Sequence, residues 1–294
     1  MQPPGLERHI SVKPVIKRIY SENDLFQHLE VLKRNRNKRI SDHEFFVEGV
    51  LSLEYAVKYG WRIKILAYAH EKPLSNWAKD LINEAHAEML LEMPLPLLTK
   101  LSDKDEDISE LVAVIEMRDY DISSLADKRN LLLVIFDRPS SHGNLGTLIR
   151  SCEAFGVDAM VMTGHAVDLY DPKTIRSSMG AFFITPCLRL PSHQELIPYF
   201  DRVRSSYPDF KVIGSSSKGE NLLEDEDMTG PTALLIGNET YGLNKNYKAL
   251  SDKIVRIPMH GESTSFNVSC AASIMLYEAD RQRRAIFKQH PHHS

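Results

Sequence analysis

The second half of the chain alternates short apolar runs with segments of helical periodicity. The sequence predicts strands at 131–136, 159–163, 181–188, 211–215, 233–237 and 253–257, helices at 145–155, 172–178, 193–206 and 244–251, and a long helix from Asn267. Strands that alternate with helices form a mostly parallel sheet with helices on both faces. Ligands bind such a sheet at the carboxyl ends of its strands, so the loops after the strands are where we expect a site.

The first half predicts a smaller α/β unit. Helices are expected at 24–33, 47–59 and 74–87, and strands at 63–69, 89–93 and 111–116. A length of 294 residues corresponds to about two domains, and a polar stretch at 118–130 separates the two patterns. We therefore divide the chain into a basic N-terminal extension (1–40), a small α/β domain (41–120), a linker (121–130) and a larger α/β domain (131–294).

Charge is unevenly distributed along the chain. The net charge of −4 excludes a globally basic nucleic-acid binder. One segment nevertheless contains five bases and no acid: Lys33, Arg34, Arg36, Lys38 and Arg39. Such a run suits the phosphates of a nucleic acid, or it is the solvated end of a helix. A second basic group near the C-terminus consists of Arg281, Arg283 and Arg284. This group is more typical of a solvated helix face than of a phosphate contact.

No apolar run is long enough to span a membrane, because the longest, 131–136, is about a third of the required length. The N-terminus shows no apolar signal segment. Cys152, Cys187 and Cys270 are too far apart for a zinc ribbon or a disulfide framework. The sequence thus predicts a cytoplasmic protein without membrane contact and without a metal.

The loop after the first strand of the second half is the first of three with polar side chains. It runs from Arg138 to Arg150. Asn144 is placed to cap the following helix, Gly146 permits close backbone approach, and Arg150 lies on a polar helix face. The loop has neither the GxGxxG spacing of a dinucleotide site nor the lysine of a P-loop. By itself it indicates a capped surface helix with a solvated arginine.

Two later loops are similarly ambiguous when each is taken alone. The turn after 233–237 places Glu239 before Gly242, which is typical of a glycine turn with a solvated acid. The loop 257–269 contains more hydroxyl and amide groups than one helix cap needs: Ser263, Thr264, Ser265 and Asn267. That loop is either flexible or a site for a polar ligand.

Together and in order, the three loops resemble the motifs of the SpoU-type RNA 2′-O-ribose methyltransferases. The motifs are Asn144-x-Gly146-x-x-x-Arg150, then Ile236-Gly237-Asn238-Glu239-x-x-Gly242-Leu243, then Ile257-Pro258-Met259 followed by Ser265-Phe266-Asn267-Val268-Ser269. Phe266 stands where that family usually has leucine. Residues 177–181 are similar to the family's S-x-G-A segment. Lys38-Arg39 followed by residues 46–49 is similar to the start of the small RNA-binding domain of many members.

The resemblance implies a fold, a cofactor and partners. The fold is an α/β trefoil-knot methyltransferase domain at the C-terminus with a smaller N-terminal α/β domain that binds the RNA substrate. The cofactor is S-adenosylmethionine, which the resemblance assigns to Gly237, Ile257, Met259 and Phe266. The expected partners are an RNA and a second copy of the chain, in a homodimer formed through the knotted domain.

The resemblance also implies a reaction, methyl transfer to a ribose 2′-hydroxyl of structured RNA. Arg150 is then the catalytic residue, either as a base or as a charged group that stabilises the developing alkoxide. Four further residues are expected to orient Arg150 or the ribose: Asn144, Glu239, Ser265 and Asn267. Ribosomal RNA is the favoured substrate. The alternatives are transfer RNA or a non-catalytic RNA-binding role, whereas a nicotinamide-dependent enzyme lacks its glycine fingerprint.

Overall fold

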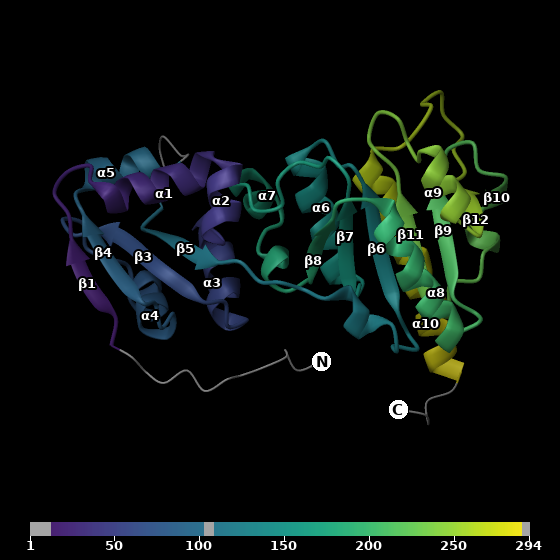
Figure 1. Cartoon of the computed structure of the whole chain (residues 1–294), viewed down its shortest axis with the longest axis horizontal. Coiled ribbons are helices and arrows are strands. Elements are labelled where there is room, and N and C mark those ends of the chain that lie inside the picture. The colour runs from purple at the N-terminus through teal and green to yellow at the C-terminus, as the bar shows by residue number, and fades with distance from the viewer. Residues whose placement is uncertain (1–12, 103–108, 290–294) are drawn as a thin grey trace. The chain divides into compact units, whose positions relative to one another are not determined.

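The computed structural model describes residues 13–102 and 109–289, so residues 1–12 of the expected extension lie outside the described part. The chain divides into two compact units (Figure 1). The first contains the residues up to Arg118 together with 168–184, and the second contains 119–167 and the residues from Thr185 onward. In the described ranges no helix combines the length and the apolar character that a membrane crossing needs.

The second unit is built on a seven-stranded sheet in the order β10-β12-β9-β11-β6-β7-β8, in which every pairing is parallel. Its strands are β6 (Leu132–Asp137), β7 (Ala159–Thr163), β8 (Cys187–Leu190), β9 (Lys211–Ser215), β10 (Asn221–Leu222), β11 (Thr232–Ile236) and β12 (Lys253–Arg256). The parallel α/β fold expected for this half is confirmed. The carboxyl ends of neighbouring β6 and β11 lie at the same edge, which brings the loops after them together.

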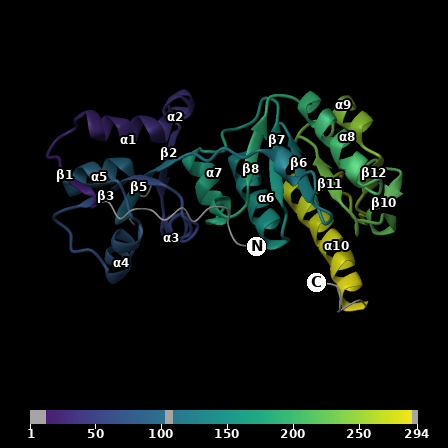
Figure 2. The ribbon, with the colours of Figure 1, turned by 60° about the horizontal axis from the view of Figure 1, so that its bottom comes forward.

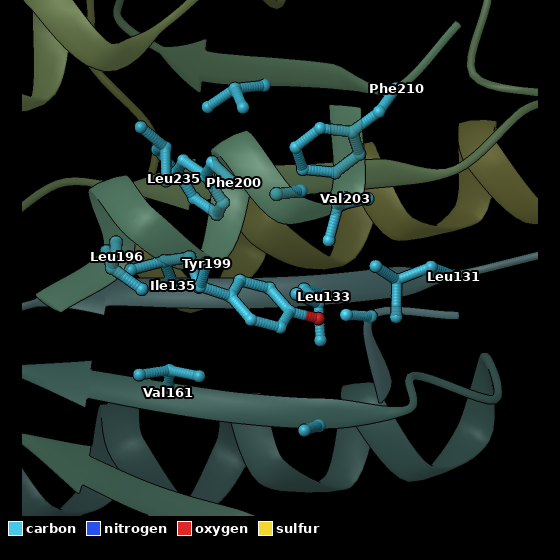
Figure 3. Close-up of a cluster of buried hydrophobic side chains, with 14 of the residues drawn as sticks. Leu131, Leu133, Ile135, Val161, Leu196, Tyr199, Phe200, Val203, Phe210 and Leu235 are labelled. Atoms are coloured by element: carbon cyan, nitrogen blue, oxygen red, sulfur yellow. The ribbon is translucent and has the colours of Figure 1, made fainter. Parts of the chain in front are cut away.

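Helices cover both faces of this sheet (Figure 2). Helices α6 (His142–Ala154) and α10 (Val268–Gln289) pack on one face, and α8 (Leu196–Ser206) and α9 (Lys245–Leu250) on the other. Figure 3 shows Leu196, Phe200 and Val203 of α8 over the side chains of β6 and β7. Strands buried on both faces explain the uninterrupted apolar runs of the sequence. Short 3-10 turns occupy Ile122–Leu125, His193–Glu195 and Leu223–Asp225.

The first unit is a five-stranded mixed sheet in the order β1-β4-β3-β5-β2. Its strands are β1 (Val15–Arg18), β2 (Glu44–Glu48), β3 (Ile63–Ala69), β4 (Met89–Met93) and β5 (Leu111–Glu116). Its helices are α1 (Asp24–Arg34), α2 (Arg36–Asp42), α3 (Val50–Lys58), α4 (Asn76–Glu84), α5 (Leu95–Leu101) and α7 (Pro172–Ser177). β1 pairs with β4 and α1 contributes Phe26 and Leu29 to the core, so residues 15–40 belong to this unit rather than preceding it.

The bounds expected for two elements and the residue expected for one cap are wrong. The helix predicted over 47–59 begins only at Val50, because Val47 and Glu48 pair with β5 and Gly49 turns the chain with φ +101°. The strand predicted over 181–188 starts at Cys187; Ala181–Phe183 form a 3-10 turn. Helix α6 is capped by Ser141 rather than Asn144, since the Ser141 hydroxyl accepts from the Asn144 N–H at 3.3 Å.

Residues 168–184 are held in the first unit by a buried ion pair. The Arg39 guanidinium is 1% exposed and donates to Asp168 Oδ2 from Nε at 2.8 Å and from Nη2 at 2.6 Å. It also donates to the Leu32 carbonyl at 2.6 Å. This corrects the RNA contact expected for Arg39, whose charge and donors are used inside the protein. Nearby, the Trp61 indole N–H donates to the Phe183 carbonyl at 2.9 Å.

We predict that Arg39→Met lowers the free energy of unfolding by about 3–5 kcal/mol, because it leaves the buried Asp168 carboxylate without its counter-charge. Lys38→Met is the matched control. Lys38 pairs with Asp42 on the surface, so its loss changes stability by only about 0.5 kcal/mol. Urea unfolding measures both. Adding Asp168→Asn to Arg39→Met recovers part of the loss; equal effects of the two single variants would contradict the assignment.

Candidate functional site

The carboxylate of Glu239 links the turn after β11 to the start of α6. It accepts hydrogen bonds from the Ser140 N–H at 2.9 Å and the Ser141 N–H at 3.0 Å. The Ser140 hydroxyl adds a third bond at 2.8 Å. Amide groups at a helix N-terminus carry partial positive charge and favour an anion. Glu239 therefore fixes the position from which α6 begins.

Asn144, in the first turn of α6, connects this pair of loops to the third. Its Nδ2 donates to Glu239 Oε1 at 3.4 Å, while its Oδ1 accepts from Asn267 Nδ2 at 3.0 Å and from the Ser269 hydroxyl at 3.2 Å. Asn267 in turn caps α10, because its Oδ1 accepts the Ser269 N–H at 2.9 Å. Three residues expected at the site, Asn144, Glu239 and Asn267, thus form one hydrogen-bonded cluster, here called the three-loop cluster.

The turn after β11 is closed by its own backbone. Asn238 and Gly242 exchange two backbone hydrogen bonds, at 3.1 and 2.9 Å. A Cβ at Gly237 would lie 2.3 Å from the backbone of Gly242 and Leu243, so only glycine permits this closure. The buried Asn238 side chain donates to the Arg138 carbonyl at 2.8 Å and accepts the Thr240 N–H at 2.9 Å. These contacts give the turn a defined shape.

Sequence reasoning missed Ser140, Asn238 and Ser269 as site residues. Asn238 and Ser269 belong to the motifs described above, and their place in those motifs could have identified them as site residues. Ser140 had no such signal, because its backbone N–H rather than its side-chain type makes it a partner of Glu239.

Glu239 is ionised at neutral pH. Burial alone would raise the pKa of its carboxyl, but hydrogen bonds from its own N–H and from Ser140 and Ser141 outweigh burial and hold that pKa below its ordinary value. A carboxylate stabilised by several donors is a weak proton acceptor. Its chemistry suits the positioning of other groups rather than general-base catalysis.

Arg150 lies about 9 Å further along α6 than Asn144 and is exposed. Within the described part of the chain its guanidinium makes no hydrogen bond or ion pair, and the exposed Ser265 likewise makes none. The structure therefore does not join Arg150 and Ser265 to the three-loop cluster. The neighbouring Ser151 hydroxyl bonds to Ser273 of α10 at 2.7 Å, which fixes the helix that presents Arg150. An unpaired guanidinium is available to an incoming anion.

The residues expected to hold the cofactor lie at the same edge of the sheet. Gly237 follows β11 and Ile257 and Met259 follow β12, while Phe266 directly precedes the cap of α10. Ile257 and Met259 are half-buried and Phe266 is 41% exposed. Partly exposed apolar side chains beside loop backbone fit a flat, neutral ring such as adenine. The residues present are thus compatible with S-adenosylmethionine.

The basic run of the first unit is mostly paired on the surface. Lys33 Nζ donates to the Leu101 carbonyl at 2.8 Å, Arg34 pairs with Glu30 at 3.0 Å and Lys38 pairs with Asp42 at 2.9 Å. The side chains of Arg34 and Lys38 remain 68% and 47% exposed. Exposed pairs of this kind are weak and exchange readily with a phosphate.

Two family models match the chain. The model described as "SpoU rRNA Methylase family" matches residues 131–277, and the model described as "SpoU L30e-like domain" matches residues 23–113. The first range contains the whole three-loop cluster. The second contains the basic run and most of the first unit.

Similar proteins span nearly the whole chain. The 23S rRNA (uridine(2479)-2′-O)-methyltransferase of Streptomyces viridochromogenes is 41% identical over 92% of this chain and 94% of its own length. The 23S rRNA (guanosine(2553)-2′-O)-methyltransferase RlmP of Bacillus subtilis is 28% identical over 82% of this chain and 90% of its own. The crystal structure of the SpoU methyltransferase AviRb from S. viridochromogenes in complex with AdoMet superposes with a TM-score of 0.85 at 40% identity, over 90% of this chain and 99% of that one.

We predict that Glu239→Gln lowers the free energy of unfolding at pH 7 by about 1–2 kcal/mol, since charged hydrogen bonds are lost from a partly solvated carboxylate. The folded-state pKa lies below the ordinary 4.5. The stabilisation is therefore complete above that value and disappears as pH falls through the folded-state pKa. Urea unfolding between pH 3.5 and 7 measures the difference. Glu262→Gln, on the exposed third loop, is the control; a pH-independent effect of Glu239→Gln would contradict the assignment.

Proposed function

The chain belongs to the SpoU rRNA methylase family, and we propose that it transfers a methyl group from S-adenosylmethionine to a ribose 2′-hydroxyl of ribosomal RNA. One observation carries the proposal: hydrogen bonds join Asn144 at the start of α6, Glu239 after β11 and Asn267 before α10, and α6 presents the exposed Arg150 further along. The 23S rRNA substrates of both relatives favour ribosomal over transfer RNA, which implies action in the cytoplasm.

The cofactor, when bound, supplies an electrophilic methyl group on its sulfonium. We assign its binding to Gly237, Ile257, Met259 and Phe266. The crystal structure of AviRb with AdoMet supports the identity of the cofactor. The backbone of the closed turn at Gly237 provides a rigid wall, and the apolar side chains exclude water from the ring. Holding two reactants in line contributes several kcal/mol to such a transfer.

Arg150 acts as a charged residue in this proposal. The arginine side chain stays protonated in proteins, so a neutral arginine base is unfavourable at physiological pH. Its unpaired donors suit an RNA phosphate and the negative charge that develops on the ribose oxygen. Asn144, Glu239, Ser265 and Asn267 position Arg150 or the ribose; Glu239 does so by anchoring the helix on which Arg150 stands.

We assign the first unit to RNA binding, with Lys33, Arg34, Arg36 and Lys38 as phosphate contacts. The match to the SpoU L30e-like domain and the exposure of Arg34 and Lys38 support this assignment. On this proposal the chain consists of an RNA-binding unit and of a methyltransferase domain that begins at about residue 131. The segment 168–184 of that domain belongs to the compact RNA-binding unit.

A trefoil knot and a homodimer complete the proposal. The match to the SpoU rRNA methylase family supports the knot, and the strand order, with β12 between β9 and β10, is compatible with it. An exposed aromatic ring on α10 supports a second copy there, since Tyr277 is 52% exposed. The dimer would bury this ring and bring two sites to one RNA.

We predict that deletion of the gene removes one 2′-O-methyl group from ribosomal RNA, detected by nucleoside mass spectrometry. The wild-type gene restores it, and Arg150→Ala does not, although the variant binds S-adenosylmethionine with unchanged affinity in calorimetry. Arg150→Lys restores only part, because a single ammonium replaces a planar fork of donors. Full restoration by Arg150→Ala would refute the role of Arg150, and no loss on deletion would refute the function.

We predict that Arg34→Gln together with Lys38→Gln weakens rRNA binding and makes the slope of log K against log salt shallower by about 1.4–1.8, for two lost phosphate contacts. Filter binding at 50–200 mM salt measures the slope. Glu30→Gln together with Asp42→Gln, which removes the acidic partners, is expected to strengthen binding. An unchanged slope in the basic variants would show that the run is a solvated surface.

A further inference from the structure

Tyr241 is the most exposed large apolar side chain of the described residues, at 79%. It stands in the turn after β11, between Glu239 and Gly242. Its hydroxyl makes no hydrogen bond within the described part of the chain. By contrast, Leu243, two residues later, is 5% exposed. The turn thus directs one apolar side chain into the core and presents the aromatic ring to solvent.

The backbone that presents Tyr241 is rigid. The Tyr241 N–H donates to Asn238 Oδ1 at 3.1 Å, and the Thr240 N–H donates to the same oxygen at 2.9 Å. The paired backbone bonds of Asn238 and Gly242 close the turn around them. An isolated exposed aromatic residue on a surface needs no explanation. A ring held on a closed turn is different, because its position is preorganised for contact.

Tyr241 also lies beside the three-loop cluster. Only Thr240 separates it from Glu239, and two residues of extended chain span at most about 7 Å. Glu239 contacts Asn144 at the start of α6, and both are among the residues that we propose to position Arg150 or the ribose. The Cα atom of Tyr241 therefore lies within about 7 Å of the Cα atom of Glu239, a residue that the proposed function places at the site.

On the basis of the proposed function, we propose that Tyr241 stacks on a base of the substrate RNA, either that of the methylated nucleotide or its neighbour. Proteins that recognise RNA specifically bind single-stranded loops and bulges, whose unstacked bases stack on aromatic side chains. Stacking uses the π-face that every base has. This suits a family in which one relative modifies a uridine and another a guanosine.

The test measures methyl transfer from S-adenosylmethionine to deproteinised 23S rRNA from cells that lack the gene. Tyr241→Ala raises KM for the RNA or lowers kcat/KM about 10- to 100-fold, as expected for the loss of one stacked base. Tyr241→Phe stays within about twofold of wild type because the ring remains. Thr240→Ala, on the same turn, controls for altered backbone. The salt dependence of RNA binding is unchanged in all three, since no charge is lost.

Four results would overturn the inference while wild type stays active. The first is a wild-type kcat/KM for RNA in Tyr241→Ala, and the second is a Tyr241→Phe variant as impaired as Tyr241→Ala. The third is a parallel loss of S-adenosylmethionine affinity in Tyr241→Ala, measured by calorimetry. The fourth is a lower oligomeric state of Tyr241→Ala in sedimentation. The third would mark Tyr241 as a cofactor contact and the fourth as a contact with a second copy. A wild-type protein that transfers no methyl group would instead refute the proposed function.

Discussion

The Glu239 carboxylate is the interaction on which the site depends. β6 and β11 are neighbours, so their following loops meet, but adjacency alone leaves two flexible loops. The ionised Glu239 carboxylate accepts hydrogen bonds from the backbone N–H groups of Ser140 and Ser141 and from the side-chain amide of Asn144. Because Asn144 Nδ2 donates to Glu239, Asn144 Oδ1 is oriented to accept the hydrogen bond from Asn267 Nδ2, just before α10. One ionised group thereby determines the start of α6 and the orientation of Asn144.

Two arginines show how tertiary packing changes the role of a base. Arg39 and Arg283 both stand in basic segments, yet each is used to satisfy buried groups. Arg39 neutralises Asp168, and Arg283 donates to four carbonyls, of Met228, Asn130, Leu131 and Gly230, at 2.7–3.1 Å. Burial lowers the pKa of Arg283. Arg39 makes five hydrogen bonds inside the protein and Arg283 makes four, so RNA contacts are sought at exposed bases such as Arg34.

Local patterns predicted most elements because burial on both faces leaves a strong signal. The strands at 63–69, 89–93, 111–116, 159–163 and 211–215 have the bounds expected from the sequence. The errors fall where an apolar run has two possible structures. Val47 reads equally well as helix or strand, and pairing with β5 decided it. The aromatic residues of 181–183 looked like a strand, but they fold as a 3-10 turn in the other unit.

The sequence by itself determined the parallel α/β fold and the three loops, because strand and helix periods are local properties and loops after parallel strands share one edge. It also pointed to Asn144, Glu239 and Asn267 through their motifs. Only the tertiary structure decided that these three bond to one another, that Arg39 is internal, and that 168–184 belongs to the first unit. Those outcomes depend on which distant donors and acceptors meet, and no local pattern encodes that.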